Sequence, residues 1–296
     1  MTDSTMRTVE PAPAAAGRFV PKRLRRILRH RSIVIGAAIV AAIVIPAIAA
    51  PLVAHFPPNE MHIRDRFTFP SGEYWMGTDA YGRDVFSRVV HGARISMGIA
   101  ALVTLIVGIC GAVLGVLAGY YRLIDGFVMR VMDALMAFPE ILLAIAITAA
   151  LGPQLNSVVI AIAAAYVPRT VRIVRASTLL IRELAFVEAA FINGVGDLRI
   201  LFRHILPNCV GPLAVQLTFV FAYAILAEAA LSFIGVGPPP PAPSWGNVIS
   251  DSRDYAAEAW WVMAFPGLAI SLAALGANLL GDGLSDLLDP RMKGNS

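Results

Sequence analysis

Gly77 and Gly82 are separated by the same number of residues as the two glycines of a phosphate-binding loop, the motif with known chemistry that this sequence comes closest to. Such a loop needs a Lys to reach the phosphates and a Ser or Thr to hold magnesium, but Arg83 and Asp84 follow here. Neither Lys of the chain follows a glycine-rich stretch. We therefore expect no ATPase site in this chain and no cofactor bound by it.

The other residue types that support catalysis or metal binding are scattered. The five His stand at positions 30, 55, 62, 91 and 204, without a His-Glu-x-x-His sequence. No Ser/His/Asp set falls on one side of the membrane that the hydropathy predicts. Cys110 and Cys209 lie in or beside apolar stretches, away from His at metal spacing, and are interpreted as small buried residues. The sequence predicts neither an enzyme nor a metal site.

Three carboxylates, Asp133, Glu140 and Glu228, interrupt otherwise apolar stretches. An ionisable group inside a bilayer is costly unless it faces a cavity or a partner, so each is a candidate for a substrate pathway. Glu228 is the candidate of most interest because it falls near the outer part of its span, whereas Asp133 and Glu140 are interpreted as structural. For Glu228 the alternative is a helix–helix hydrogen bond or an interfacial charge, and we favour that alternative.

The elements that must position these residues are transmembrane helices. Hydrophobic residues make up 57% of the 296 residues and charged residues only 15%, against roughly 25% charged in soluble domains. A span needs about 20 apolar residues. We expect an all-α integral membrane protein with six spans, at 32–54, 95–121, two helices between about 127 and 175 joined by a turn at 151–157, 209–235 and 259–281.

The basic residues predict the orientation of these spans. With both termini in the cytoplasm, 18 of the 24 Lys and Arg residues fall inside, which satisfies the positive-inside rule. Residues 1–31 and 285–296 are then cytoplasmic tails and 55–93 an external segment. Four consecutive prolines at 238–241 fall in an outer loop, where a stiff segment could shape a lid or a docking surface. The net charge of +4 therefore reflects the orientation of the spans in the membrane and is not evidence for nucleic-acid binding.

Residues 182–208 form the longest stretch on the cytoplasmic side that is neither lipid-like nor a simple tail. Helical spacing predicts a first helix up to Asn193, and 194–196 break the pattern. Asp197 is expected to cap a second helix and Pro207 to end it. The apolar stripes expected on the two helices are Leu184, Val187, Phe191 and Ile192, and Leu198, Leu201, Phe202 and Ile205. The pattern alone fits an amphipathic pair resting on lipid; a DNA-reading helix-turn-helix is improbable between two spans.

Within this stretch, Glu188-Ala189-Ala190, then Gly194, then Ile205-Leu206-Pro207 resembles the EAA loop of ABC importer permeases. In that family the loop docks into a cleft on a cytoplasmic ATPase and transmits its closure. The family pattern has Ile where this chain has His204. The resemblance implies that the coupling residues are Glu188, Ala189, Ala190, Gly194, Leu206 and Pro207. Gly194 would permit the turn, the two alanines would allow close approach of a helix, and Pro207 would end the loop.

Further stretches in the right order are similar to the C-type subunits of dipeptide and oligopeptide permeases. They lie at 75–79, 82–88, 92–96, 231–235, 243–246, 278–284 and 289–291. Together they span residues 75–291. This resemblance implies the type I ABC importer permease fold, with a permease domain at 94–284 and one extra N-terminal helix.

The resemblance also implies partners and a location. Half a pore needs a second permease subunit of B type, and the family adds two ATPase subunits, which bind ATP and Mg, and an external substrate-binding protein. The location implied is the bacterial cytoplasmic membrane. The expected substrate is a peptide, most simply a dipeptide, whose amino terminus Glu228 could meet; oligopeptides, glutathione and nickel stay open. The rivals from other classes are an ATPase-independent secondary transporter and a membrane-embedded enzyme.

Overall fold

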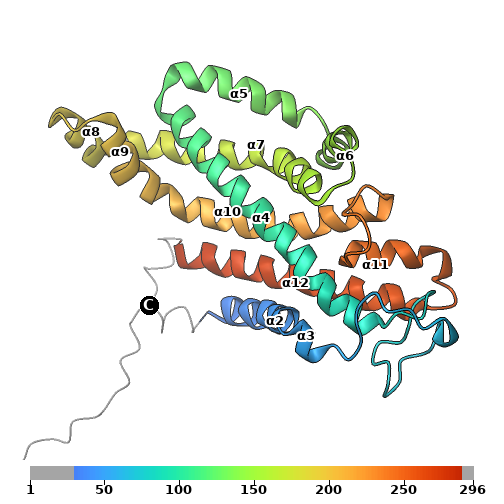
Figure 1. Ribbon diagram of the computed structural model, residues 1–296. Helices are drawn as coiled ribbons and strands as arrows, with labels where there is room; N and C mark the ends of the chain where they lie inside the picture. The colour runs from blue at the N-terminus through green and yellow to red at the C-terminus, as the bar shows by residue number, and fades with distance from the viewer. Residues whose placement is uncertain (1–29, 289–296) are drawn as a thin grey trace, which may run out of the picture.

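The computed structural model describes residues 30–288, and every extended regular element in that range is a helix (Figure 1). Almost all of the two tails predicted at 1–31 and 285–296 lies outside the described residues. The α-helices are α2 (Arg31–Ile48), α3 (Ala50–Val53), α4 (Val85–Tyr120), α5 (Arg122–Met136), α6 (Glu140–Leu151), α7 (Leu155–Arg182), α8 (Ala185–Ile192), α9 (Asp197–Ile200), α10 (Leu206–Ile234), α11 (Trp245–Ser252) and α12 (Trp260–Leu288). Short 3-10 turns lie at Ile63–Asp65 and Arg253–Tyr255, and a π-helical turn at Leu201–Ile205 joins α9 to α10. The all-α prediction is confirmed.

Five helices within residues 30–288 are long and apolar enough to cross a bilayer: α2, α4, α7, the continuous run Asp197–Ile234 and α12. A sixth span exists if α5 and α6 are counted together, although they meet at 92°. The third predicted span is therefore not one straight helix. It breaks because Phe138 precedes Pro139, and a residue before proline is pushed out of the helical region.

The second span begins earlier than its hydropathy predicts. Helix α4 starts at Val85, so the last part of the segment predicted at 55–93 is already helical. Asp84 caps this helix by accepting a 2.8 Å hydrogen bond from the backbone N–H of Ser87. The first turns carry buried polar residues, Ser87 and Arg88, which the hydropathy pattern reads as a loop.

Helices α4 and α7 pack at close range along a row of small residues. A methyl group added at Gly111, Gly115 or Gly119 would lie 2.5–2.6 Å from Thr170, Val174 or Thr178 respectively, closer than real side-chain contacts allow. Both rows repeat every four residues, which places them on one face of each helix. Small residues let two helices approach closely in a membrane, where packing rather than water expulsion drives association.

The N-terminal helix α2 also packs against the bundle through close contacts at glycines. A methyl group at Gly36 would lie 2.7 Å from the carbonyl oxygen of Gly276, and one at Gly283 would lie 2.4 Å from Ile33. Both Gly276 and Gly283 belong to α12. Helix α2 is therefore an added element seated directly against the last span, as the extra N-terminal helix of the predicted fold requires.

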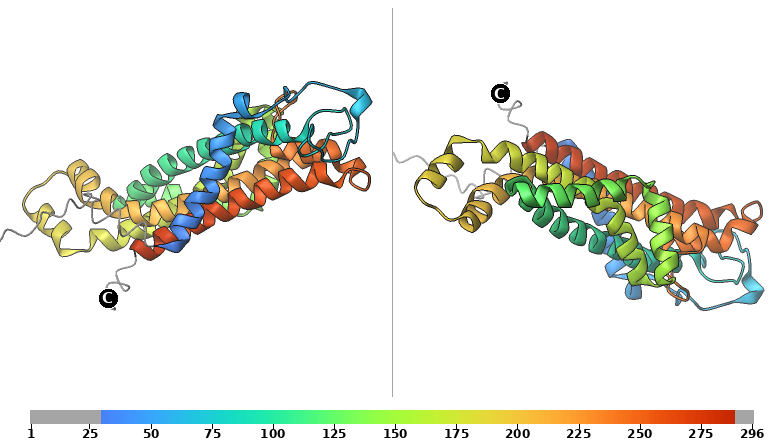
Figure 2. Two further views of the ribbon diagram at one scale, coloured as in Figure 1. Left: turned by 90° about the horizontal axis from the view of Figure 1, so that it is seen from below. Right: turned by 90° about the horizontal axis from the view of Figure 1, so that it is seen from above.

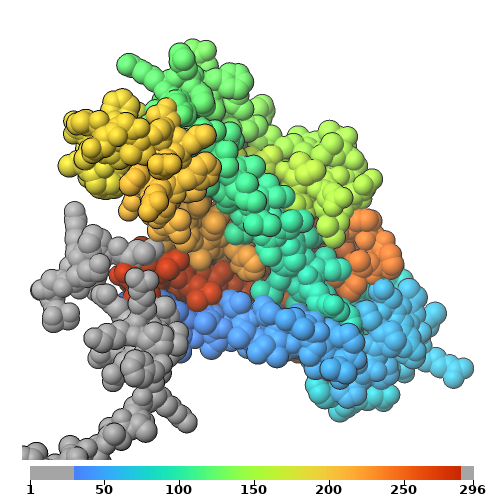
Figure 3. Space-filling view, turned by 60° about the vertical axis from the view of Figure 1, so that its left-hand side comes forward, coloured from blue at the N-terminus to red at the C-terminus, as the bar shows by residue number. Residues whose placement is uncertain are grey.

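The molecule is elongated and its two ends differ. Helices α8 and α9 project at one end, where α2 begins and α12 ends (Figures 1 and 2). The opposite end holds α3, α11 and the irregular chain before α4 (Figure 1). In the space-filling view the α8–α9 region forms a knob well separated from the 50–80 region (Figure 3).

Candidate functional site

The projecting knob carries the segment 182–208, and its turn is built around Gly194. Helix α8 ends with Gly194 at φ +75°, and the backbone N–H groups of Gly194 and Val195 donate to the carbonyls of Phe191 and Ala190 at 2.9 and 3.1 Å. This pair of bonds is the Schellman arrangement, which places a left-handed residue just past a helix. Glycine adopts that conformation without steric cost. The predicted role of Gly194 in permitting the turn has a direct geometric basis.

The second half of the segment differs from its prediction in two places. Asp197 does not cap α9; Gly196 is the N-cap residue, and the Asp197 carboxylate points instead to two tyrosines of α4 and its end. Pro207 does not end the helix. The π turn before it places Leu206 so that its N–H donates to Leu201, and Pro207 then falls in the first turn of α10, where a missing N–H costs nothing.

The apolar stripes of the loop are only partly as predicted. Val187, Leu201 and Ile205 are buried, together with Ile200, which the stripe pattern omits. They pack with Val116 of α4, Val174 of α7 and Cys209 of α10 in a small cluster beneath the loop. The loop therefore has its own core, and that core is continuous with the spans that lead to and from it.

The remaining stripe residues are exposed in this structure, as a face that rests on lipid or meets a partner would be. Phe191 is 66% and Ile192 75% exposed, and Leu184, Leu198 and Phe202 are exposed as well. Glu188 and Ala189 beside them are also exposed, Ala190 is half-buried, and Gly194 is open to solvent. Large apolar side chains gathered on a projecting surface mark a site of interaction. The exposed side of helix α8 is therefore a candidate interaction surface.

The six predicted coupling residues do not form one patch. Glu188, Ala189, Ala190 and Gly194 lie together on α8 and its turn, whereas Leu206 and Pro207 lie at the start of α10. Leu206 is half-buried against the cluster beneath the loop, and Pro207 is exposed. The first group can make direct contact with a partner, while Leu206 supports the loop from below.

Both ends of the loop are attached to the same end of α4. Arg182, at the end of α7, donates from Nη1 to the carbonyl oxygen of Gly119 at 3.1 Å. Asp197 accepts hydrogen bonds from the hydroxyls of Tyr120 at 2.9 Å and Tyr121 at 3.3 Å. Partial desolvation and the Asp197 carboxylate raise the pKa of Tyr121, so its hydroxyl keeps the proton that it donates. The sequence pattern singles out neither tyrosine, because their only signal is a pair of aromatic hydroxyls at the end of an apolar span.

A double substitution, Tyr120→Phe with Tyr121→Phe, is expected to loosen the loop without unfolding the bundle. It removes two solvent-exposed hydroxyl donors to a carboxylate and keeps both rings, so the loop is expected to open more often by a factor of about 2 to 10. Hydrogen exchange of residues 185–200 should quicken by about that factor. Exchange in α12, which contributes no residue to the cluster beneath the loop, serves as the internal control, and equal quickening there would contradict a local attachment.

Glu228 lies far from this loop, in the interior of the bundle. Its side chain is fully buried, and its two oxygens accept 2.8 Å hydrogen bonds from the hydroxyls of Ser96 and Ser232. The Ser96 oxygen in turn accepts from the backbone N–H of Trp245 at 3.1 Å, so the group joins α4, α10 and α11. This is the helix–helix hydrogen bond that is the alternative to substrate contact. A role for Glu228 in the substrate pathway stays a prediction.

The other two membrane carboxylates lie near the arginines of α7. Asp133 pairs with Arg172 at 2.5 Å, and both side chains are about half exposed. Glu140 begins α6 and lines a small pocket together with Arg169. One further ion pair, Arg175 with Asp125 at 2.5 and 2.7 Å, ties α5 to α7. These contacts fit the structural interpretation of Asp133 and Glu140.

Two family models match the chain. Residues 111–294 match the model described as binding-protein-dependent transport system inner membrane component. Residues 22–70 match the N-terminal TM domain of oligopeptide transport permease C. The second match covers α2, the helix that is seated against α12.

Similar proteins come from several bacteria. A protein of Brucella abortus, provisionally described as a peptide transport system permease, is 55% identical over 269 residues that cover 91% of both chains. The dipeptide transport system permease protein of Alkalihalophilus pseudofirmus is 44% identical, with 91% of this chain and 89% of that one covered. The glutathione transport system permease protein of Pectobacterium atrosepticum is 40% identical, with 91% and 90% covered.

Proposed function

The chain belongs to the inner membrane components of binding-protein-dependent transport systems, within the peptide ABC permeases, and on that premise we propose that it is a permease subunit of an ATP-driven dipeptide importer. In this proposal it forms half of the translocation pore. It couples to cytoplasmic ATPases through α8 and the turn at Gly194. The observation that carries the coupling role is the projecting helix α8, which exposes large apolar side chains yet is rooted in a buried cluster shared with α4, α7 and α10.

The proposed complex has a second permease subunit of B type, two ATPase subunits that bind ATP and Mg, and an external substrate-binding protein. The proposed location is the bacterial inner membrane with both termini in the cytoplasm. The start of α2 and the end of α12 lie at the same end as α8 and α9, which supports this orientation because a cytoplasmic ATPase must reach the loop from that end (Figure 1).

The proposed mechanism is alternating access driven by the ATPases. When the ATPases close on ATP, they draw the two coupling loops of the complex together. In this chain α8 follows α7 closely along the backbone, and the pull passes on to α4 by two routes. One is the hydrogen bond from Arg182 at the end of α7 to Gly119, and the other is the pair of bonds from Tyr120 and Tyr121 to Asp197. Because the backbone of α4 at three glycines lies directly against side chains of α7, the two helices are expected to move as one rigid pair. Hydrolysis and release reverse the motion.

The substrate class is proposed from the relatives, whose names specify peptides, dipeptides and, in one case, glutathione. A dipeptide is the first choice because a dipeptide permease and a di/tripeptide permease of Pseudomonas aeruginosa, 45% identical, are both close. Glutathione, itself a small peptide, is the second choice. Oligopeptide or nickel import would use the same coupling loop with another binding protein.

Reconstitution tests the proposal. The chain, its B-type partner and the two ATPases are placed in liposomes, the binding protein is added outside, and uptake of a labelled dipeptide is followed. We expect uptake that requires ATP and all the subunits, with glutathione offered in parallel to separate the two substrate choices. Uptake by the two permeases with the ATPases omitted would overturn the ATP-driven importer and favour a secondary transporter.

A further inference from the structure

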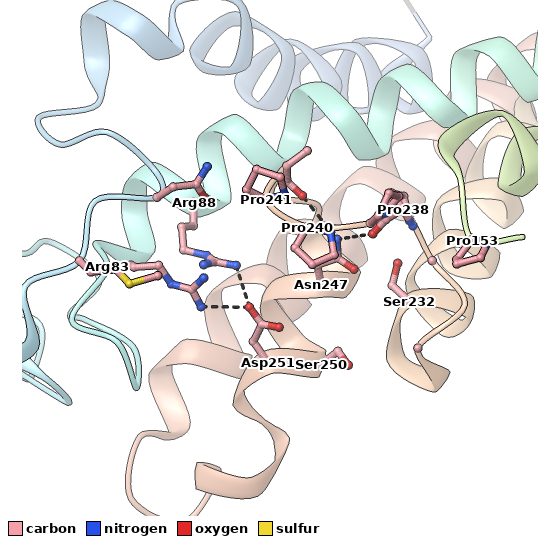
Figure 4. A pocket seen from close by; sticks show the side chains of 16 residues that line it. Arg83, Arg88, Pro153, Ser232, Pro238, Pro240, Pro241, Asn247, Ser250 and Asp251 are labelled. Carbon is pink, nitrogen blue, oxygen red and sulfur yellow. Dashed lines mark hydrogen bonds and ion pairs between the residues drawn. The ribbon is translucent and has the colours of Figure 1, made fainter.

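A cavity of about 410 Å³ lies at the end of the molecule opposite to α8 and α9. Five parts of the chain line it: the segment before α4 with the first turn of α4, the turn before α7, the end of α10, the proline-rich loop 237–242, and α11 (Figure 4). Asn247 of α11 holds the loop in place, since its side-chain N–H groups donate to the carbonyls of Pro238 at 2.9 Å and Ala242 at 3.4 Å. The proline-rich wall of the cavity is thus held against α11.

One end of this cavity is charged. Figure 4 shows the guanidinium groups of Arg83 and Arg88 pointing at one carboxylate oxygen of Asp251, and each Nη2 lies 3.0 Å from it. The side chain of Arg88 is only 3% exposed, and that of Arg83 11%, whereas that of Asp251 is 41% exposed. Asp251 is therefore the member of this group that can move into solvent most easily.

The donors of Arg88 are incompletely used. Within residues 30–288, its Nε and Nη1 groups have no hydrogen-bond acceptor, although both are buried. The nearest other carboxylate, Asp79, lies 3.5 Å from Nη1 and is engaged by Arg83, whose Nε is 2.6 Å from it. A buried guanidinium with unused donors is costly unless an acceptor completes it. Arg88 therefore has capacity for a further carboxylate oxygen.

We propose that this cavity is a subsite for the C-terminal carboxylate of a free peptide. The inference rests on the proposed function, which supplies the peptide and places this end of the molecule outside. The peptide carboxylate takes the place of Asp251 between Arg83 and Arg88, and Asp251 turns into solvent. Arginine suits this exchange because its planar donors match a carboxylate in pairs. The buried charge stays balanced, since one carboxylate replaces another.

The shape of the cavity favours a small molecule over a protein side chain. Its volume lies within the range of roughly 300–1,000 Å³ that small-molecule pockets have. The end away from the arginines is lined by Pro153, Pro238 and Pro240, which offer apolar surface to a peptide side chain (Figure 4). A charged end and an apolar end match a short peptide with its carboxylate directed inward.

The competing interpretation is that Asp251 only ties α11 to the start of α4. The two interpretations give opposite expectations for Asp251→Asn, which keeps the size of the side chain and removes its charge. A purely structural ion pair predicts no peptide binding in either protein. A subsite that Asp251 occupies predicts tighter binding in the variant, because the two guanidinium groups lose their internal competitor.

The experiment uses the full permease–ATPase complex in lipid nanodiscs without the external binding protein. Binding of isotope-labelled alanyl-leucine is measured by equilibrium dialysis at fixed ionic strength, beside alanyl-leucine amide, which lacks the carboxylate. We expect Asp251→Asn to tighten binding of the acid about tenfold, with the amide bound weakly by both proteins. Arg83→Gln in the Asp251→Asn background should remove most of the gain.

Equal binding of acid and amide, or no gain in Asp251→Asn, would overturn the subsite. A change in attachment of the external binding protein without any peptide binding would assign the arginines to protein docking and also overturn it. Dipeptide uptake by the wild-type complex is measured in parallel. Intact ATP-dependent uptake with no carboxylate-dependent binding would refute the subsite alone, whereas the absence of uptake would refute the proposed importer.

Discussion

Replacing Gly194 by Val is expected to reduce ATP-dependent uptake about 5- to 30-fold while the protein still enters the membrane normally. Gly194 closes the end of α8 at φ +75°, a left-handed conformation that costs an ordinary residue about 1–2 kcal/mol and a β-branched residue more. No atom lies within 4 Å of the position a new Cβ would take, so crowding inside the chain does not contribute. A penalty of that size lowers the population of the docking conformation by the stated factor.

Gly196 supplies a matched control two residues away. It lies in the same exposed turn with an equally open Cβ position, but its φ of −64° and ψ of 148° suit any residue. Gly196→Val should therefore keep most of the uptake. Both variants are compared by initial rate of dipeptide uptake and by ATPase stimulation in proteoliposomes. Normal uptake by Gly194→Val, or equal loss in both, would show that the left-handed turn does not govern coupling.

The sequence pattern predicts this turn correctly because the chemistry is local. A glycine pair between two helical stretches predicts a turn whichever way the rest of the chain folds. The first span and the break at 151–157 follow in the same way from hydropathy and turn residues, and α6 indeed ends at Leu151 and α7 begins at Leu155. Contacts between residues close in sequence are the part that a single sequence specifies most directly.

The features that the sequence does not reveal depend on distant partners. Asp197 is a reasonable capping residue until Tyr120 and Tyr121, more than 70 positions earlier, offer their hydroxyls. Val187 is buried while Phe191 and Ile192 of the same stripe are exposed, and the sequence does not reveal this difference because the helical period cannot distinguish a face buried in the chain from an exposed one. Pro207 continues a helix because the π turn before it removes the conflict.

Glu228 in the bundle and Asp251 in the cavity are two more residues whose partners the sequence does not reveal. The position of Glu228 in an apolar span predicts a polar partner but not which one, and Ser96 lies 132 positions away. Asp251 has no signal of its own, since it stands in a polar loop region where a carboxylate is ordinary. Only the fold brings it to Arg83 and Arg88, which lie 168 and 163 positions earlier.

The second large effect is expected at Gly115, in the contact between α4 and α7. A Cβ there would lie 2.6 Å from the Cβ of Val174 and 2.9 Å from the backbone oxygen of Val171. Because the nearest obstacles are a backbone atom and a branched side chain, neither can move aside cheaply, and Gly115→Leu must push the two helices apart. Overpacking of this kind costs about 1–3 kcal/mol, which corresponds to a fall of about 2–10 °C in melting temperature.

Gly98 on the same helix is the control, because it is exposed and no atom lies within 4 Å of its Cβ position. Gly98→Leu adds the same side chain to α4 on a face that packs against nothing in this chain, so it should keep the melting temperature measured by size-exclusion chromatography of heated, fluorescently tagged protein. If Gly115→Leu were as stable as Gly98→Leu, the close α4–α7 contact would be dispensable. That result would also remove the basis for the proposed rigid link between the coupling loop and the pore, since a contact that tolerates a leucine cannot hold two helices in a fixed relation.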